Sequence, residues 1–254
     1  MIACMNIGIL ESGRPLPEII GQWGDFPDAF RRLLGAVEPS WQYEVFAAIN
    51  GDLPASPDVC DAWLITGSKF AAYDTDPWIG ALETFIRDVY ASGQPLVGIC
   101  FGHQLIAQAL GGRVELSDRG WGVGVHTYDV KPEMGFALHT DGIAMQAFHQ
   151  DQVVKLPAAA EIVASSAFCP AAMLKYGDQI RTVQAHPEFD ADFVRTLLAA
   201  RRAKVVPEPV AARADATLDS PTHAHEVARW LADCLAQGGA DGSASHAAER
   251  RPRL

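Results

Sequence analysis

The segment from residue 95 to residue 112 constrains the fold of this chain more than any other. An apolar run over residues 96–99 follows a proline and predicts the end of a buried strand. Residues 101–110 place apolar side chains at helical spacing, and a Gly-Gly pair follows them as a stop signal. Cys100 is therefore expected on a sharp turn from a strand into a helix.

This turn has the geometry of the nucleophile elbow of serine hydrolases, with a thiol in place of the hydroxyl. Gly98 and Gly102 flank Cys100 and are expected to tolerate a strained backbone there. The unpaired N–H groups and the positive end of a helix dipole favour a thiolate at this position. The same N–H groups can stabilise an oxyanion. The pattern predicts a nucleophilic cysteine rather than a buried, inert one.

Composition excludes several classes of protein. The 254 residues carry a formal net charge of -11, which argues against nucleic acid or an anionic membrane as a partner. No apolar run is long enough to span a bilayer, and no secretory signal is recognisable at the N-terminus. The five cysteines contain no CxxC pair, so neither a disulfide framework nor a metal site is expected. We therefore expect a cytoplasmic protein that uses no metal or cofactor.

The order of the predicted elements indicates an α/β fold with an open, mainly parallel sheet flanked by helices. An antiparallel extension is expected after residue 120. Strands are predicted at residues 7–10, 41–47, 62–65, 96–99, 121–130, 143–148, 161–166, 171–176 and 181–189, and helices at residues 28–34, 77–90, 101–110, 192–203 and 225–235.

Three regions are expected along the chain. Residues 1–203 form the catalytic domain, and residues 204–235 form a linker and a C-terminal helix that packs on it. Residues 236–254 are rich in Gly, Ala, Ser and charged residues, which predicts a disordered tail.

A cysteine nucleophile needs a base, and the base needs an orienting group. His186-Pro187-Glu188 offers both, because side chains two apart on a strand point the same way. The carboxylate of Glu188 can hold one tautomer of the imidazole and stabilise its protonated form. Thr66-Gly67-Ser68-Lys69 follows a predicted parallel strand, so this turn is expected to reach the same crevice as Cys100.

Together these motifs resemble those of the class I, triad-type glutamine amidotransferases, and in particular stand-alone members similar to the glutaminase part of GMP synthase. The resemblance rests on residues 98–104, 186–188, 66–68 and 148–151, and covers roughly residues 5 to 200. It implies a flavodoxin-like fold and thiol-dependent hydrolysis of the glutamine amide through a γ-glutamyl thioester.

Carried over to this sequence, the resemblance implies a role for each of ten residues. Cys100 is the nucleophile, His186 the general base and then acid, and Glu188 its orienting group. The oxyanion hole is formed by backbone N–H groups of Phe101, Gly67 and Lys69, although a positive φ would be costly for lysine. The residues that hold the substrate are Gln104, Phe148, His149 and Gln150. His103 is expected to support structure.

Four functions stay open at this point. The chain could hydrolyse glutamine and pass ammonia to a separate synthetase, or hydrolyse a γ-glutamyl peptide or amine without a partner. It could instead be a non-catalytic regulatory subunit that kept the fold. The fourth is a related cysteine-elbow enzyme that uses a carboxylate such as Glu11, in which case Glu188 would be dispensable.

Overall fold

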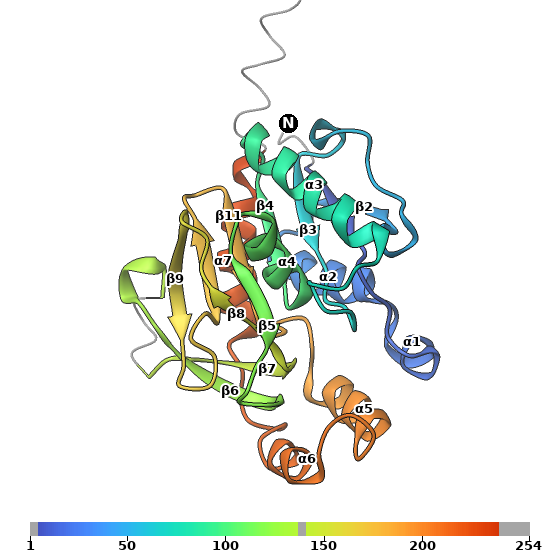
Figure 1. Ribbon diagram of the computed structural model, residues 1–254, viewed down its shortest axis with the longest axis vertical. Coiled ribbons are helices and arrows are strands. Elements are labelled where there is room, and N and C mark those ends of the chain that lie inside the picture. Colours follow the sequence, from blue (N-terminus) through green and yellow to red (C-terminus); the bar gives the residue numbers. More distant parts are fainter. Residues whose placement is uncertain (1–4, 137–140, 239–254) are drawn as a thin grey trace, which may run out of the picture.

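A mixed, nine-stranded sheet forms the centre of the computed structural model, which describes residues 5–136 and 141–238 (Figure 1). The strand order is β2-β1-β3-β4-β11-β10-β9-β6-β7. Pairing is parallel from β2 to β11 and antiparallel from β11 to β7. The strands are β1 (Asn6–Leu10), β2 (Gln42–Phe46), β3 (Ala62–Ile65), β4 (Leu96–Ile99), β6 (Gly122–Val130), β7 (Ile143–His149), β9 (Ala160–Ser165), β10 (Met173–Tyr176) and β11 (Ile180–Val183).

Helices bury both faces of the parallel part. On one face α2 (Phe26–Gly35) and α7 (Ala224–Leu235) pack against side chains such as Ile9 and Val97. On the other face α3 (Pro77–Ser92) and α4 (Phe101–Ala109) pack against Trp63 and Leu96. Successive residues of a strand face opposite sides, so Leu96 and Val97 belong to different cores. This accounts for the continuous apolar runs in the sequence.

A third apolar cluster lies at one end of the sheet, where α1 (Pro17–Trp23), α5 (Ala191–Arg201) and α6 (Glu208–Asp215) gather (Figure 1). The loop from β1 leads into α1, and the segment after β11 leads into α5. Both connections leave the carboxyl ends of parallel strands, which is where open α/β sheets place their sites. The third cluster therefore packs beside the expected site.

The predicted α/β fold is confirmed, and most of the predicted elements are present with shifted ends. The sequence prediction missed α1 and the strands β5 (Arg113–Leu116) and β8 (Asp151–Lys155), which pair with each other in a separate two-stranded sheet. The stretch predicted as a linker contains α6, whose Ala211 and Ala214 are buried. Helix α2 begins earlier than predicted: Asp25 is its N-cap, and Asp28, the third residue of the helix, completes the capping box.

The predicted tail falls almost entirely outside the described residues, which end at residue 238. None of the helices in the described ranges is both long and apolar enough to cross a bilayer.

Candidate active site

Cys100 occupies the turn between β4 and α4, as predicted. Its φ of 52° and ψ of -101° put a non-glycine residue in a sparsely populated backbone region. Two hydrogen bonds hold it there: Cys100 N donates to Val183 O at 2.8 Å, and Gln104 N donates to Cys100 O at 3.0 Å. The strain is thus imposed by β11 on one side and α4 on the other, and it is of the kind found at functional sites.

The flanking glycines have a different role from the predicted one, since neither has a positive φ. A Cβ on Gly98 would lie 2.7 Å from the backbone of Gly102, and a Cβ on Gly102 would lie 2.5 Å from Ile65 O. The glycines therefore let β3, β4 and α4 approach one another closely, while Cys100 itself adopts the strained conformation.

His186 and Glu188 lie just beyond the end of β11. His186 N donates to Gln146 O at 2.8 Å, which ties this segment to β7. His186 Nδ1 donates to Glu188 Oε1 at 2.7 Å. The side chains are 5% and 1% exposed, so the pair is almost completely buried. The two residues meet across a turn after the strand, and not through the strand alternation that the sequence predicted.

The electrostatics of this pair favour an imidazolium. Burial of the ring opposes its protonation, but Glu188 and Cys100 outweigh burial and raise the pKa of His186 to about 10. Its hydrogen bond to Glu188 leaves Nε2 as the nitrogen available to other groups. At neutral pH the ring is therefore a charged donor beside the sulfur of Cys100.

Gly67 brings the turn after β3 against both groups. A Cβ on Gly67 would lie 3.1 Å from Cε1 of His186 and 3.8 Å from Cβ of Cys100. The turn is fixed through Ser68, whose Oγ donates to Ser12 O at 2.7 Å and accepts from Phe70 N at 3.2 Å. Lys69 does not have a positive φ, so the cost anticipated for lysine does not arise.

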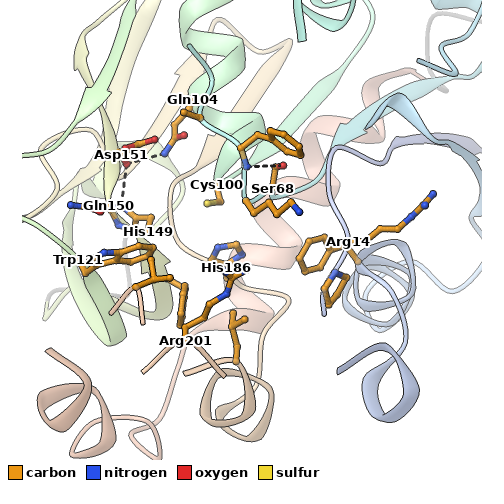
Figure 2. A pocket seen from close by; sticks show the side chains of 18 of the residues that line it. Arg14, Ser68, Cys100, Gln104, Trp121, His149, Gln150, Asp151, His186 and Arg201 are labelled. Atoms are coloured by element: carbon orange, nitrogen blue, oxygen red, sulfur yellow. Dashed lines mark hydrogen bonds between the residues drawn. The ribbon is translucent and has the colours of Figure 1, made fainter. Parts of the chain in front are cut away.

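A cavity of about 400 Å³ opens over these groups. Figure 2 shows Cys100 and His186 at its centre, with Gln104 and Asp151 towards one end and Arg201 towards the other. The cavity is also lined by Lys69 and by the three residues predicted from the 148–151 segment, Phe148, His149 and Gln150. The structure thus brings the separate sequence motifs to one place.

Gln104 and His149 brace the cavity wall. Gln104 Nε2 donates to Asp151 O at 2.8 Å and to Gln184 Oε1 at 3.1 Å. His149 Nδ1 lies 3.2 Å from the same carbonyl oxygen, and burial lowers the pKa of His149 to about 3. The amide nitrogen of Gln104 is therefore engaged in holding the 148–151 segment in place.

His103 lies in the first turn of α4 and does not line the cavity. It is fully buried, with Nδ1 2.8 Å from Thr182 Oγ1, and burial lowers its pKa to about 3. This neutral histidine links α4 to β11, in agreement with the structural role expected for it.

The other titratable candidates lie away from the cavity lining. Burial raises the pKa of Cys60, Cys169 and Cys234 to about 12 each, so these thiols stay protonated. Glu11 is buried and bonded to Arg14 at 2.7 Å. Cys4 lies outside the described residues. In the described part of the chain, no cluster of three or more His, Cys, Asp and Glu side chains is arranged to hold a metal ion.

Several residues of the cavity wall were missed by the sequence prediction. They come from the loop before α1, from α2 and from the end of α5, and include Arg14, Leu16, Phe26, Arg201 and Val205. These segments carry no motif, and only the folding of α1 and α5 onto the end of the sheet brings them to the site.

Comparison with known proteins agrees with this geometry. The family model described as glutamine amidotransferase class-I matches residues 63–198. A glutamine amidotransferase-like protein of Schizosaccharomyces pombe is 31% identical over 206 residues, covering 76% of this chain and 83% of that protein. Gamma-glutamyl peptidase 5 of Arabidopsis thaliana is 28% identical over 207 residues, covering 78% and 82%.

A further relative and a solved structure extend the comparison. The gamma-glutamyl-L-1-hydroxyisopropylamide hydrolase of a Pseudomonas species is 31% identical over 190 residues, covering 63% of this chain and 62% of that protein. The crystal structure of a glutamine amidotransferase from Methylobacillus flagellatus superposes with a TM-score of 0.72 at 22% identity, covering 94% of this chain and 96% of the other. The chain therefore belongs to the class I glutamine amidotransferase family and is an enzyme of its amide-hydrolysing type.

Proposed function

We propose that the chain hydrolyses γ-glutamyl amide bonds whose leaving amine is larger than ammonia, as in γ-glutamyl peptides and γ-glutamyl amines. In this proposal Cys100, His186 and Glu188 form the catalytic triad, and no partner synthetase is needed. The observation that carries it is the size and lining of the cavity around Cys100.

The triad geometry supports a two-step acyl transfer. The thiolate of Cys100 attacks the γ-carbonyl carbon, and N–H groups of Phe101, Gly67 and Lys69 stabilise the oxyanion. His186 gives its proton to the leaving amine as the C–N bond breaks, which leaves a γ-glutamyl thioester on Cys100. His186 then takes a proton from water, and hydroxide attack releases glutamate and the thiolate.

The cavity offers room and apolar surface for a leaving group. Its volume of about 400 Å³ falls in the range of roughly 300–1,000 Å³ that is typical of sites for small organic ligands. Leu116 and Trp121 line it from the end of β5 and the loop before β6, and Leu197 and Val205 line it from α5 and the turn that follows. Ammonia would need none of this surface, whereas a peptide or an amine would bury carbon atoms against it. The names of the peptidase and hydrolase relatives agree with this preference.

A second candidate is hydrolysis of glutamine with transfer of ammonia to a separate synthetase. Three large apolar side chains that line the cavity, Tyr73, Leu116 and Val205, are between 44% and 59% exposed. Exposed apolar residues at the mouth of a site would suit the docking surface of a partner protein.

Glutamate release by the purified chain distinguishes the two. Glutamine is compared with γ-glutamylglycine and γ-glutamylethylamide, with Cys100→Ala as the control. We expect kcat/KM for at least one of the larger substrates to exceed that for glutamine by about 10-fold or more, a factor that corresponds to roughly 1.4 kcal/mol. Preference for glutamine would favour the second candidate. Hydrolysis that persists in Cys100→Ala would refute both.

A further inference from the structure

The cavity lining is richer in cations than the chain as a whole, which is acidic. The sequence has 20 Lys and Arg residues against 31 Asp and Glu. The cavity lining reverses this balance: it contains the cations Arg14, Lys69 and Arg201 but only two carboxylates, Asp74 and Asp151. The lining is therefore less acidic than the molecule as a whole, and a cation of the lining that lacks a carboxylate partner is a candidate for binding an anionic group.

Neutral donors of the protein hydrogen-bond to both carboxylates of the lining, and carboxylates outside the lining pair with one of its cations. Asp74 Oδ2 accepts from Ala71 N at 2.9 Å, and Asp151 Oδ1 accepts from the hydroxyl of Tyr73 at 3.3 Å. Arg14 donates to both carboxylate oxygens of Glu11, at 3.2 and 2.7 Å, and lies 3.8 Å from Asp25. Arg14 is thus neutralised within its own loop.

Arg201 and Lys69 remain without a carboxylate partner among residues 5–136 and 141–238. Arg201 is half-buried at the end of α5, and Leu197 and Val205 lie four residues to either side of it. All three line the cavity, and Val205 N donates to Arg201 O at 2.9 Å across the turn that follows α5. Arg202, the next residue, is instead paired with Glu208 and Asp215 outside the cavity.

Arg201 lies on the side of the cavity where the leaving group is expected. In the proposed mechanism His186 protonates the leaving amine, so that amine departs on the His186 side of Cys100. Figure 2 shows Arg201 beyond His186, at the end of the cavity opposite to Gln104 and Asp151. The glutamyl part of the substrate is expected near Gln104 and the 148–151 segment. Arg201 then faces the leaving amine, on the other side of the scissile bond.

We infer that Arg201 binds a carboxylate carried by the leaving amine. This inference rests on the proposed function and narrows it: the preferred substrates are γ-glutamyl amino acids or short γ-glutamyl peptides, rather than γ-glutamyl alkylamines. A guanidinium binds a carboxylate through two parallel hydrogen bonds, which gives direction as well as charge.

The test compares γ-glutamylglycine with γ-glutamylglycinamide, which differ only by a carboxylate against a carboxamide. The wild type is expected to prefer γ-glutamylglycine. The Arg201→Gln variant is expected to have a kcat/KM for γ-glutamylglycine that is lower by about 10-fold or more, whereas its kcat/KM for γ-glutamylglycinamide changes by less than about 3-fold. Arg201→Lys should restore part of the preference. Lys204→Gln is the matched control, because it removes the same charge three residues away, from a side chain that is exposed and does not line the cavity.

Each outcome of this comparison either supports or overturns carboxylate binding by Arg201. The ratio of the two kcat/KM values within one variant does not depend on how much of the protein is folded, so a poorly folded variant still gives a result. An equal loss on both substrates would leave that ratio unchanged, and would overturn the inference. So would a wild type that treats the two substrates alike. If γ-glutamyl compounds of every kind are left intact, the proposed function itself fails.

Discussion

The rings of His186 and Phe189 stack face to face, with centroids 4.1 Å apart and planes 4° apart. Phe189 stacks in turn on Phe193 of α5, at 4.2 Å between centroids. Glu188 fixes one edge of the imidazole and Phe189 covers one face of it. The third apolar cluster therefore controls the orientation of the proposed general base.

Replacing Phe189 tests this control. We expect Phe189→Leu to lower kcat by about 10-fold or more with a smaller change in KM, because the imidazole loses the surface that orients it. Phe193→Leu is the control: it should cost a similar free energy of unfolding, about 1–2 kcal/mol, with little effect on kcat. Steady-state kinetics and urea unfolding measure the two effects. Equal kcat in the two variants would contradict an orienting role for Phe189.

The pH dependence of the reaction should report the Glu188–His186 pair. The pKa of His186 is raised to about 10, so the protonated ring needed to expel the amine persists until the pH rises to about that value. Glu188→Gln removes a main cause of the raised pKa, and the alkaline limb of kcat/KM is expected to move at least about one unit lower. A pH–rate profile of each protein measures the shift. An unmoved limb would mean that another group sets it.

The backbone strain at Cys100 predicts a stability difference between two inactive variants. Glycine adopts a φ of 52° without the steric cost that a Cβ brings, whereas alanine keeps that cost. We expect Cys100→Gly to be about 1 kcal/mol more stable to urea than Cys100→Ala, despite the greater flexibility of glycine in the unfolded chain. If alanine gives the more stable variant, the strain is not a significant cost to this fold.

His103 should make the fold sensitive to acid. Its pKa is lowered to about 3 in the folded protein and is about 6.5 in an unfolded chain. Between these values the unfolded chain binds a proton that the folded one does not, so the free energy of unfolding falls as the pH falls. His103→Gln is expected to reduce that slope by about 1.4 kcal/mol per pH unit. Urea unfolding at several pH values between 7 and 4.5 measures it, and an unchanged slope would show that the pKa of His103 is not lowered in the fold.

Local sequence was sufficient for the elements whose periodicity is strong. The apolar runs of β1, β3 and β4 and the helical stripes of α3 and α7 predicted the α/β fold, because burial on one or both faces dictates those patterns. The elbow at Cys100 was also predicted, since a strand, a Gly-x-Cys-x-Gly turn and a helix follow directly in the chain. Helices α1 and α6 were missed because they are short and weakly patterned, and only packing on the third cluster stabilises them.

The sequence by itself determined which groups can do the chemistry, and the tertiary structure decided how they are arranged and what surrounds them. Residue types and local spacing placed a thiol on an elbow and a carboxylate two residues from a histidine. That Gly67, Cys100 and His186 meet, and that the strain falls on Cys100 rather than on its glycines, depends on contacts between β3, β4 and β11. The cations Arg14 and Arg201 come from segments far apart in the chain, so only the folding of α1 and α5 onto the sheet could bring them to one cavity.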